Sequence, residues 1–313
     1  MSIDSNAFET YRRSASAKTT LPRLIVGAAI IVVFWVLSTL GVIVGGMLVA
    51  ARLQAGADGG IPDMTGFLTT PAGVVTALGS FAGIWIGAWI AMRFLHREPL
   101  SALFGNSRRI DWGGFARGFG AVLITSLLSE VLLYALEPQI ARGSISIASW
   151  LTALLPVALL TLLQTSSEEL LFRAYLPRGL AKRFRSPLVW AALPVLVFAS
   201  LHWSSSASPI MNATGLVTIA VFAALLMALV YATGNLGAAM GAHLANNLFG
   251  FLLISHQQAY DAFALFEGRP LEGAGWNGAE ALLITAIGVV STLLTALLLL
   301  HPRSPLKVEA DLG

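Results

Sequence analysis

The sequence contains no cysteine, which excludes disulfide bonds, thiolate metal sites and a cysteine nucleophile. Charged side chains are also scarce, because Asp, Glu, Lys and Arg make up 11% of the 313 residues, against about 25% in an ordinary soluble domain. Hydrophobic residues reach 56%, and this balance excludes a single water-soluble globule. The net charge of +3 comes from short basic clusters between apolar segments, so we expect no nucleic-acid partner.

The long stretches without a charged residue include 24–51, 64–92, 143–167 and 186–260. A transmembrane helix needs about 20 apolar residues. Turn-forming residues at 204–212 and 233–237 divide the last stretch into three helices. The pattern predicts an all-α, polytopic integral membrane bundle of about eight transmembrane helices in contact with the lipid bilayer. The expected spans are 24–50, 71–92, 115–136, 149–176, 188–203, 213–232, 236–256 and 278–300.

The Lys and Arg residues predict the orientation, because cytoplasmic loops are enriched in them. With the N-terminus inside, 16 of the 19 Lys and Arg residues fall on the cytoplasmic side, and Arg52, Arg142 and Arg269 fall outside. We therefore expect a multi-pass protein of the cytoplasmic membrane with both termini in the cytoplasm. The expected organisation is a cytoplasmic arm at 1–23, a single transmembrane domain at 24–302 and a cytoplasmic tail at 303–313.

The fourth predicted span carries ionisable residues, which are costly inside a bilayer and are therefore functional candidates. They are Glu168, Glu169 and Arg173. In a helix Glu169 and Arg173 share one face, whereas Glu168 points about 100° away. Arg173 is expected to neutralise Glu169 and to leave Glu168 as the free carboxylate. The simpler interpretation is a solvated helix end with two acids and a basic flank.

Two later spans carry further polar pairs with helical spacing. Phe198 and His202 are four residues apart, and so are His243 and Asn247. Histidine exchanges protons near neutral pH and is the commonest metal ligand, and an asparagine amide can donate to a developing oxyanion. A lone membrane histidine more often hydrogen-bonds a neighbouring helix. Polar groups on three helices, however, favour a shared site.

These groups allow two mechanisms. A carboxylate base, two imidazoles and an amide can activate water against a carbonyl. Alternatively, Glu168, His202 and His243 could hold a divalent metal such as Zn²⁺ with an open position for water. The sequence leaves both open, so the expected cofactor is either a divalent metal or none.

Two more polar residues lie near predicted membrane boundaries. Glu130, in the third span, is a minor candidate that would face a water-filled cavity or the outer interface. His256 falls at the end of the seventh span, and we expect it to be interfacial.

The three motifs together resemble a known family. Glu-Glu-x-x-x-Arg at 168–173, Phe-x-x-x-His at 198–202 and His-x-x-x-Asn at 243–247 are similar to the motifs of the CPBP intramembrane proteases. This family includes the type II CAAX prenyl endopeptidases and bacteriocin-processing relatives such as lysostaphin-resistance protein A. The motif-bearing region is about 149–256, and we expect the catalytic core there.

The resemblance implies an all-helical, multi-pass endopeptidase acting on a peptide or on another membrane protein. By analogy, Glu168 would activate water, and His202 and His243 would support that water or a metal. Asn247 would donate to the oxyanion, Glu169 and Arg173 would form a supporting ion pair, and Phe198 would pack. The family is described both as glutamate-dependent and as metal-dependent, and we expect access from the cytoplasm.

The predicted spans leave one geometric difficulty. Counted from the basic loop at 178–185, Glu168 lies 10 residues along one helix and His202 lies 17 along the next. At 1.5 Å per residue these positions differ by about 10 Å along the membrane normal. Helix tilt or a delayed entry of the fifth span would have to close this gap.

Two other classes of function would use the same polar groups. A proton-coupled carrier would place them in a midplane relay, with broken helices in two equivalent halves. A non-catalytic membrane binding partner would be expected to lose Glu168 or a histidine, and both histidines and Glu168 are present.

Overall fold

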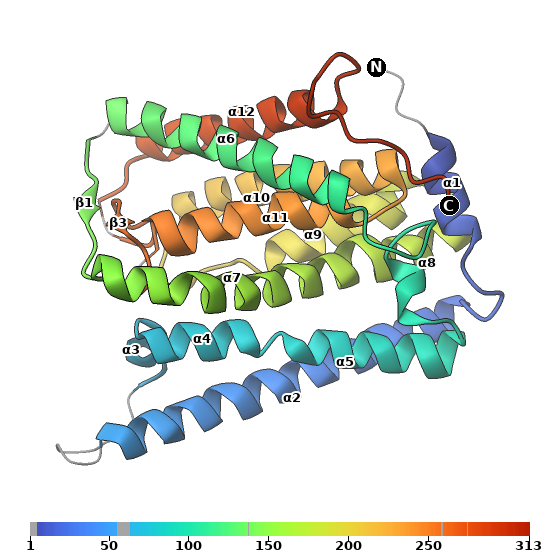
Figure 1. Cartoon of the computed structure of the whole chain (residues 1–313), viewed down its shortest axis with the longest axis horizontal. Coiled ribbons are helices and arrows are strands. Elements are labelled where there is room, and N and C mark those ends of the chain that lie inside the picture. Colours follow the sequence, from blue (N-terminus) through green and yellow to red (C-terminus); the bar gives the residue numbers. More distant parts are fainter. Residues whose placement is uncertain (1–4, 55–62, 137, 258, 274) are drawn as a thin grey trace.

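The computed structural model describes residues 5–54, 63–136, 138–257, 259–273 and 275–313, and these residues form a helical bundle (Figure 1). The α-helices are α1 (Ser5–Arg13), α2 (Leu21–Gln54), α3 (Met64–Leu68), α4 (Pro71–Gly79), α5 (Ala82–Ile90), α6 (Trp112–Leu136), α7 (Ile147–Glu169), α8 (Leu176–Arg183), α9 (Leu193–Ser200), α10 (Pro209–Thr233), α11 (Gly237–Leu248) and α12 (Gly278–Leu300). The π-helical segments are η1 (Ala91–His96), η3 (Leu170–Tyr175), η4 (Leu188–Ala192) and η5 (Phe249–Leu253), and η2 (Leu100–Leu103) is a 3₁₀-helix. The strands are β1 (Ala141–Arg142), β2 (Ile254–Ser255) and β3 (Phe266–Glu267).

The helical membrane bundle predicted from the apolar stretches is confirmed, whereas the count of eight spans is not. Within the described residues, six helices are long and apolar enough to cross a membrane. They cover Leu21–Leu53, Pro71–His96, Trp112–Leu136, Ile147–Arg183, Pro209–Thr233 and Gly278–Leu300. The other two expected spans are shorter helical segments, at Leu188–Ser200 and at residues 237–253.

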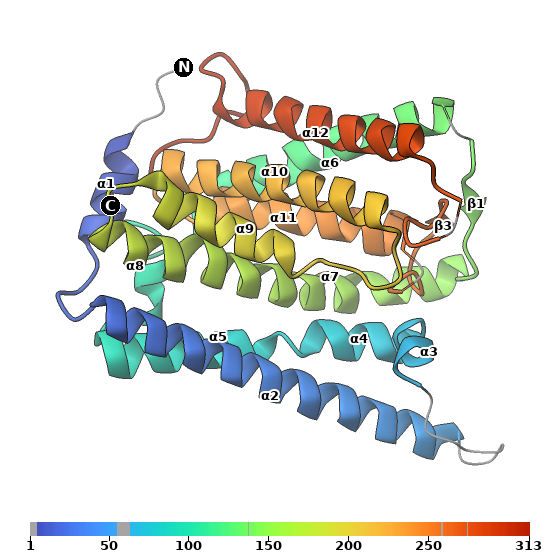
Figure 2. The ribbon, with the colours of Figure 1, turned by 180° about the vertical axis from the view of Figure 1, so that it is seen from behind.

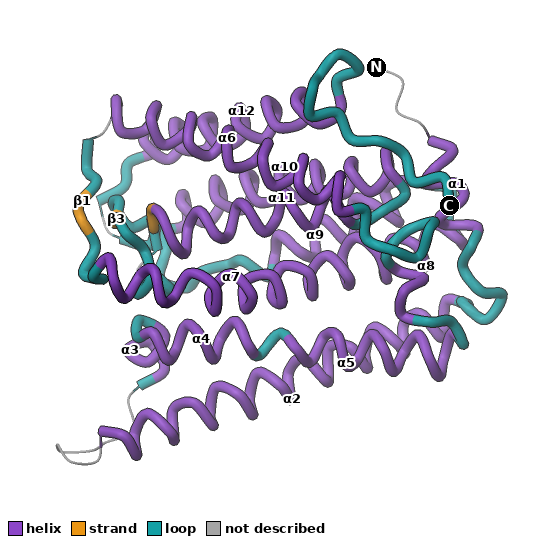
Figure 3. Tube along the Cα trace, viewed as in Figure 1, coloured by secondary structure: helices purple, strands orange, loops and turns teal. Residues whose placement is uncertain are grey.

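The helices pack in layers and leave their connections at two ends. α2 lies against α4 and α5, the central layer holds α7, α9, α10 and α11, and α6 pairs with α12 on the opposite side (Figures 1 and 2). Strands β1, β3 and β2 form a small sheet at one end of the bundle (Figure 3), which we call the sheet end. Both chain termini lie at the other end, the termini end (Figure 1).

The α6–α11 pair is held together by backbone contact. A Cβ atom at Gly118 would overlap the carbonyl oxygen of Ala238, and one at Gly241 would overlap that of Phe115. Membrane helices gain packing energy from such close approach, because lipid provides no hydrophobic force between them. The glycines therefore set the distance between α6 and α11, and α11 carries His243 and Asn247.

Helix α9 ends halfway across the bundle. Residues 188–200 extend for about 20 Å and the neighbouring α10 for about 37 Å, at 1.5 Å per residue. Residues 201–208 complete the crossing without helical structure (Figure 2). Asn212 holds this loop, because its side chain accepts from the Ser204 N–H at 2.9 Å and donates to the Ser204 carbonyl at 2.7 Å. His202 therefore lies just after the end of α9, about halfway along the length of the bundle.

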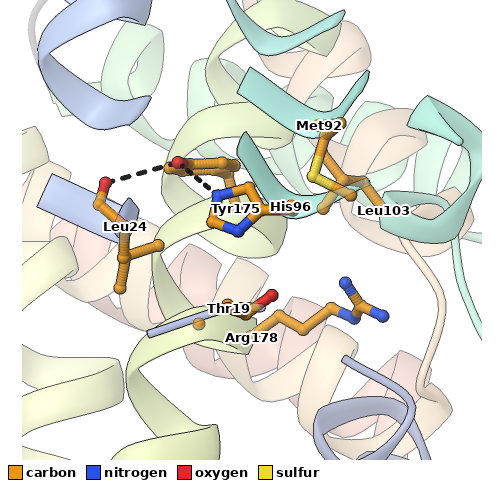
Figure 4. Close-up of a pocket in the computed structure, with 8 residues that line it drawn as sticks. Thr19, Leu24, Met92, His96, Leu103, Tyr175 and Arg178 are labelled. Carbon is orange, nitrogen blue, oxygen red and sulfur yellow. Dashed lines mark hydrogen bonds between the residues drawn. The ribbon is translucent and has the colours of Figure 1, made fainter. Parts of the chain in front are cut away.

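The termini end is closed by α1. Tyr11 donates a hydrogen bond to the Leu103 carbonyl at 2.6 Å, and Arg178 on α8 pairs with Glu98 at 2.9 Å and donates to the Tyr11 carbonyl. Beside this contact is a cavity of about 10 Å³ (Figure 4), enough for about one water. The buried Nδ1 of His96 has no hydrogen-bond partner in the described structure, while its Nε2 contacts the Tyr175 hydroxyl at 2.9 Å. A single ordered water would satisfy His96 there.

We predict that Gly118→Ala destabilises the protein by about 1–3 kcal/mol, because the new methyl group must push the α11 backbone away. Gly120→Ala on the same helix is the matched control, since its Cβ would have no atom within 4 Å. This control should be neutral or stabilising by up to about 1 kcal/mol. Thermal unfolding in detergent, followed by tryptophan fluorescence, measures both. Equal melting temperatures for the two variants would contradict the close contact.

Candidate active site

Two consecutive carboxylates lie buried at the end of α7. Glu168 is 7% exposed and Glu169 is fully buried. The π-helical segment η3 begins directly after them, and such turns often occur at functional sites because they shift the side-chain register. The helix therefore delivers both carboxylates to the bundle interior.

His243 on α11 lies between these carboxylates. Its Nδ1 is 2.7 Å from Oε1 of Glu169, and its Nε2 is 3.5 Å from Oε2 of Glu168. Nδ1 donates to the Glu169 carboxylate, and Nε2 faces Glu168. Both carboxylates therefore lie beside the same imidazole, although consecutive residues of a helix point about 100° apart.

Arg173 forms an ion pair with the buried Glu169, as their i,i+4 spacing predicts. Its Nη1 is 3.2 Å from Oε1 of Glu169, and its guanidinium lies 4.2 Å from the centre of the Phe198 ring. The Glu169 contact is an ion pair and does not have hydrogen-bond geometry. Phe198 also contacts His202 and His243, with ring centres 4.7 and 6.0 Å apart. Phe198 therefore connects the arginine to both histidines.

His202 reaches the open side of the site. It is exposed, and its Nδ1 donates to the Phe198 carbonyl at 3.0 Å, which leaves Nε2 free to contact a ligand. His202 also lies close enough to Glu168 for the two groups to interact electrostatically.

The expected difference of about 10 Å in depth between Glu168 and His202 does not occur in the structure. The fourth helix does not end at 176, because α8 continues it to Arg183 and the chain turns only at residues 184–187. Measured from this turn, Glu168 and His202 are 16 and 15 residues away, so both lie at nearly the same depth.

Gln164 belongs to the site and was missed in the sequence. It is 7% exposed and lies four residues before Glu168 on the same helix face. Its Oε1 accepts a hydrogen bond from Nδ2 of Asn247 at 2.9 Å, and its side chain lies beside Glu168. The available signal was an amide one helical turn before Glu168 in an otherwise apolar span.

Two carboxylate oxygens in this cluster have no hydrogen bond in the described structure, Oε2 of Glu169 and Oε2 of Glu168. Oε2 of Glu168 is buried, points toward Nε2 of His243 and lacks a partner within hydrogen-bond geometry in the described structure. A buried carboxylate oxygen without a donor is costly. Such an oxygen can accept a hydrogen bond from an incoming water.

The metal alternative does not fit this arrangement. Across the described ranges, no group of three or more His, Cys, Asp and Glu side chains is placed to hold a metal ion. Both nitrogens of His243 face carboxylates, and His202 lies at the open side. We therefore derive no step through a metal.

Comparison with known proteins supports the motif resemblance. Residues 148–249, which carry all three motifs, match the family model described as "Type II CAAX prenyl endopeptidase Rce1-like". This similarity of the Rce1-like segment, residues 148–249, suggests CAAX-type intramembrane protease activity, which is a hydrolase activity.

A curated relative covers more of the chain. "Uncharacterized protein YyaK" of Bacillus subtilis (strain 168) is 26% identical over 213 residues, which is 65% of this chain and 70% of that protein. No solved structure matches the chain.

Glu130 and His256 form a separate pair outside the Rce1-like segment. Nε2 of His256 is 3.0 Å from Oε1 of Glu130, and its Nδ1 donates to the Arg269 carbonyl at 3.3 Å. Burial disfavours the imidazolium, but the Glu130 carboxylate and the Arg269 carbonyl outweigh it and raise the pKa of His256. The pair links the end of α6 to the chain that follows α11, at the sheet end.

We predict that this pair stabilises the protein in a pH-dependent way. The pKa of His256 is raised in the folded protein. Its contribution to the free energy of unfolding is therefore complete below the ordinary pKa of about 6.5, and it is lost as the pH rises through the pKa of the folded state. Melting temperatures of wild type and Glu130→Gln should therefore differ most near pH 5.5 and converge at alkaline pH. A difference that grows with pH would contradict the pairing. Arg142→Gln, also at the sheet end, is the control that keeps the pair.

Proposed function

We propose that this protein is an intramembrane endopeptidase in which Glu168 activates water directly. The observation that supports this most is the buried, unpartnered Oε2 of Glu168 facing Nε2 of His243 at 3.5 Å. Among the described residues, a carboxylate, two imidazoles and an amide are grouped there. The proposed domain organisation keeps one transmembrane domain at 24–302, with the catalytic core at 149–256.

The first proposed step is attack on the scissile carbonyl. Glu168 accepts a proton from water, and the resulting hydroxide oxygen bonds to the carbonyl carbon, which becomes a tetrahedral oxyanion. Glu169 keeps His243 in the tautomer whose Nε2 faces Glu168, and the positive Arg173 compensates the carboxylate charges. The site therefore gains a proton on Glu168 and a negative charge on the substrate oxygen.

The second step breaks the peptide bond. Asn247 has two amide hydrogens, and Gln164 takes one of them, so the other can donate to the oxyanion. His202 has a free Nε2 on the open side, where it can contact the substrate. When the oxyanion collapses, Glu168 returns its proton to the leaving amine. One water is consumed, and an acid and an amine are formed.

Cleavage of a quenched peptide library by purified protein in detergent tests this mechanism. Glu168→Gln should reduce kcat by about 10²- to 10⁴-fold, because general-base catalysis contributes that factor. Glu309→Gln, on the exposed tail at the termini end, is the control. A chelator should leave wild-type cleavage unchanged. Loss of cleavage with the chelator would assign the water to a metal, and equal rates for wild type and Glu168→Gln would refute the role of Glu168.

The same assay tests whether Gln164 positions its neighbours. Gln164→Leu should lower kcat by about tenfold with little change in KM, because it removes the hydrogen bond that holds Asn247 and changes the side chain beside Glu168, without removing a substrate contact. Its melting temperature shows whether the variant folds. An unchanged kcat in a folded variant would contradict the positioning role. If the folded wild type cleaves no library member, the non-catalytic binding role gains support.

We further propose that the termini end faces the cytoplasm and that substrate reaches the site from that side. The expected excess of Lys and Arg falls at this end, and both termini lie together there (Figure 1). The substrate would be a peptide or a segment of another membrane protein.

Single cysteines test the orientation cleanly, because the chain has no native cysteine. In intact cells, Ser304→Cys should resist a membrane-impermeant maleimide, and Ser144→Cys should react with it. The reverse pattern would place the termini end outside.

A further inference from the structure

A second cavity lies at the termini end, outside the candidate active site. It has a volume of about 240 Å³ and lies between α1, the turn at 184–187, η4 and α10. Binding sites for drug-sized ligands are usually about 300–1,000 Å³. This cavity is therefore sized for a small group, such as a headgroup.

Three aromatic rings form one wall of the cavity. Phe8 stacks on Trp190 with ring centres 4.6 Å apart, and Trp190 stacks on Tyr231 at 5.8 Å. Tryptophan and tyrosine gather at membrane–water interfaces, where their rings meet the headgroups. The rings lie where α10 ends and η4 begins, which is the depth expected for headgroups.

The charged lining leaves one cation uncompensated. Glu9 contacts Arg12 at 2.6 Å and Arg13 at 3.2 Å, and the Arg12 hydrogen bond holds the pKa of Glu9 below its ordinary value. Glu9 and Arg12 therefore neutralise each other. No ion pair involves Arg185 anywhere in the described chain, although Arg185 lines the same cavity. An anion is the complementary ligand.

An exposed apolar stripe continues from this cavity along η4 and α9. Leu188, Leu193 and Leu196 are 75%, 50% and 61% exposed, and they lie on the segment that begins just after Arg185. A free phosphate would leave this stripe unused. A phospholipid would use both features, with its phosphate at Arg185 and its acyl chains on the leucines.

We propose that this cavity binds the phosphate group of an anionic membrane phospholipid. Arg185 contacts the phosphate, and the stacked rings of Phe8, Trp190 and Tyr231 border the glycerol region. The binding ties α1 to the turn at 184–187 and to α10. It does not rest on the proposed protease activity.

Thermal unfolding of the full chain in uncharged detergent tests this proposal, with tryptophan fluorescence as the readout. Dihexanoyl phosphatidylglycerol should raise the melting temperature of wild type in a saturable way. Arg185→Ala should raise the half-saturating lipid concentration by about tenfold, because one charged contact with the phosphate is lost. Arg183→Ala is the matched control, since Arg183 is an exposed arginine two residues away that does not line the cavity. It should titrate like wild type.

Three outcomes would overturn the proposal. An equal shift with inorganic phosphate would assign the cavity to free phosphate, and an equal shift with dihexanoyl phosphatidylcholine would remove the requirement for an anion. Equal weakening by Arg183→Ala and Arg185→Ala would show diffuse attraction to the basic end without a site. Arg185 is exposed and its side chain makes no ion pair in the described structure, so the Arg185→Ala variant is expected to fold.

Discussion

The buried contact of Arg173, Glu169 and His243 is the constraint on which the arrangement of the central helices depends. Charges removed from water must be paired inside the protein, since breaking one buried partner costs several kcal/mol. Arg173 and Glu169 are 1% and 0% exposed, and His243 completes the contact from a different helix. The requirement brings α7 and η3 against α11 and orients the ring that faces Glu168. Stability and the proposed chemistry therefore draw on the same three side chains.

Close helix contacts make that charge cluster possible. Glycines let α6 and α11 touch through their backbones, which fixes the depth of His243 and Asn247. On the other side, α9 stops halfway and is followed by a loop held by Asn212. Irregular backbone at membrane depth is tolerated where it lines a cavity or is buried in protein. Because α9 ends at Ser200, His202 lies in the loop that follows it, where its side chain is exposed.

The two ends of the bundle have different structures. At the sheet end, the Glu130–His256 pair and three short strands join segments that are far apart in the sequence. At the termini end, α1 covers the turn at 184–187 and η4, and it forms one wall of the cavity that contains Arg185. The candidate active site lies between them. Segment η4, which lines that cavity through Trp190, continues directly into α9, which carries Phe198.

The sequence by itself determined the features that depend on local spacing. Apolar stretches of sufficient length identified the membrane helices, and the i,i+4 spacing paired Glu169 with Arg173 before any fold was known. Only the tertiary structure decided which residues meet between helices. Gln164 reaches Asn247, and Glu130 reaches His256, across 83 and 126 residues of chain, and no local period records such distances. Helix ends were also misjudged, because Lys182 and Arg183 resemble a cytoplasmic loop while continuing a helix. The charged residues indicate where the chain leaves the membrane, whereas packing against α1 determines where α8 ends.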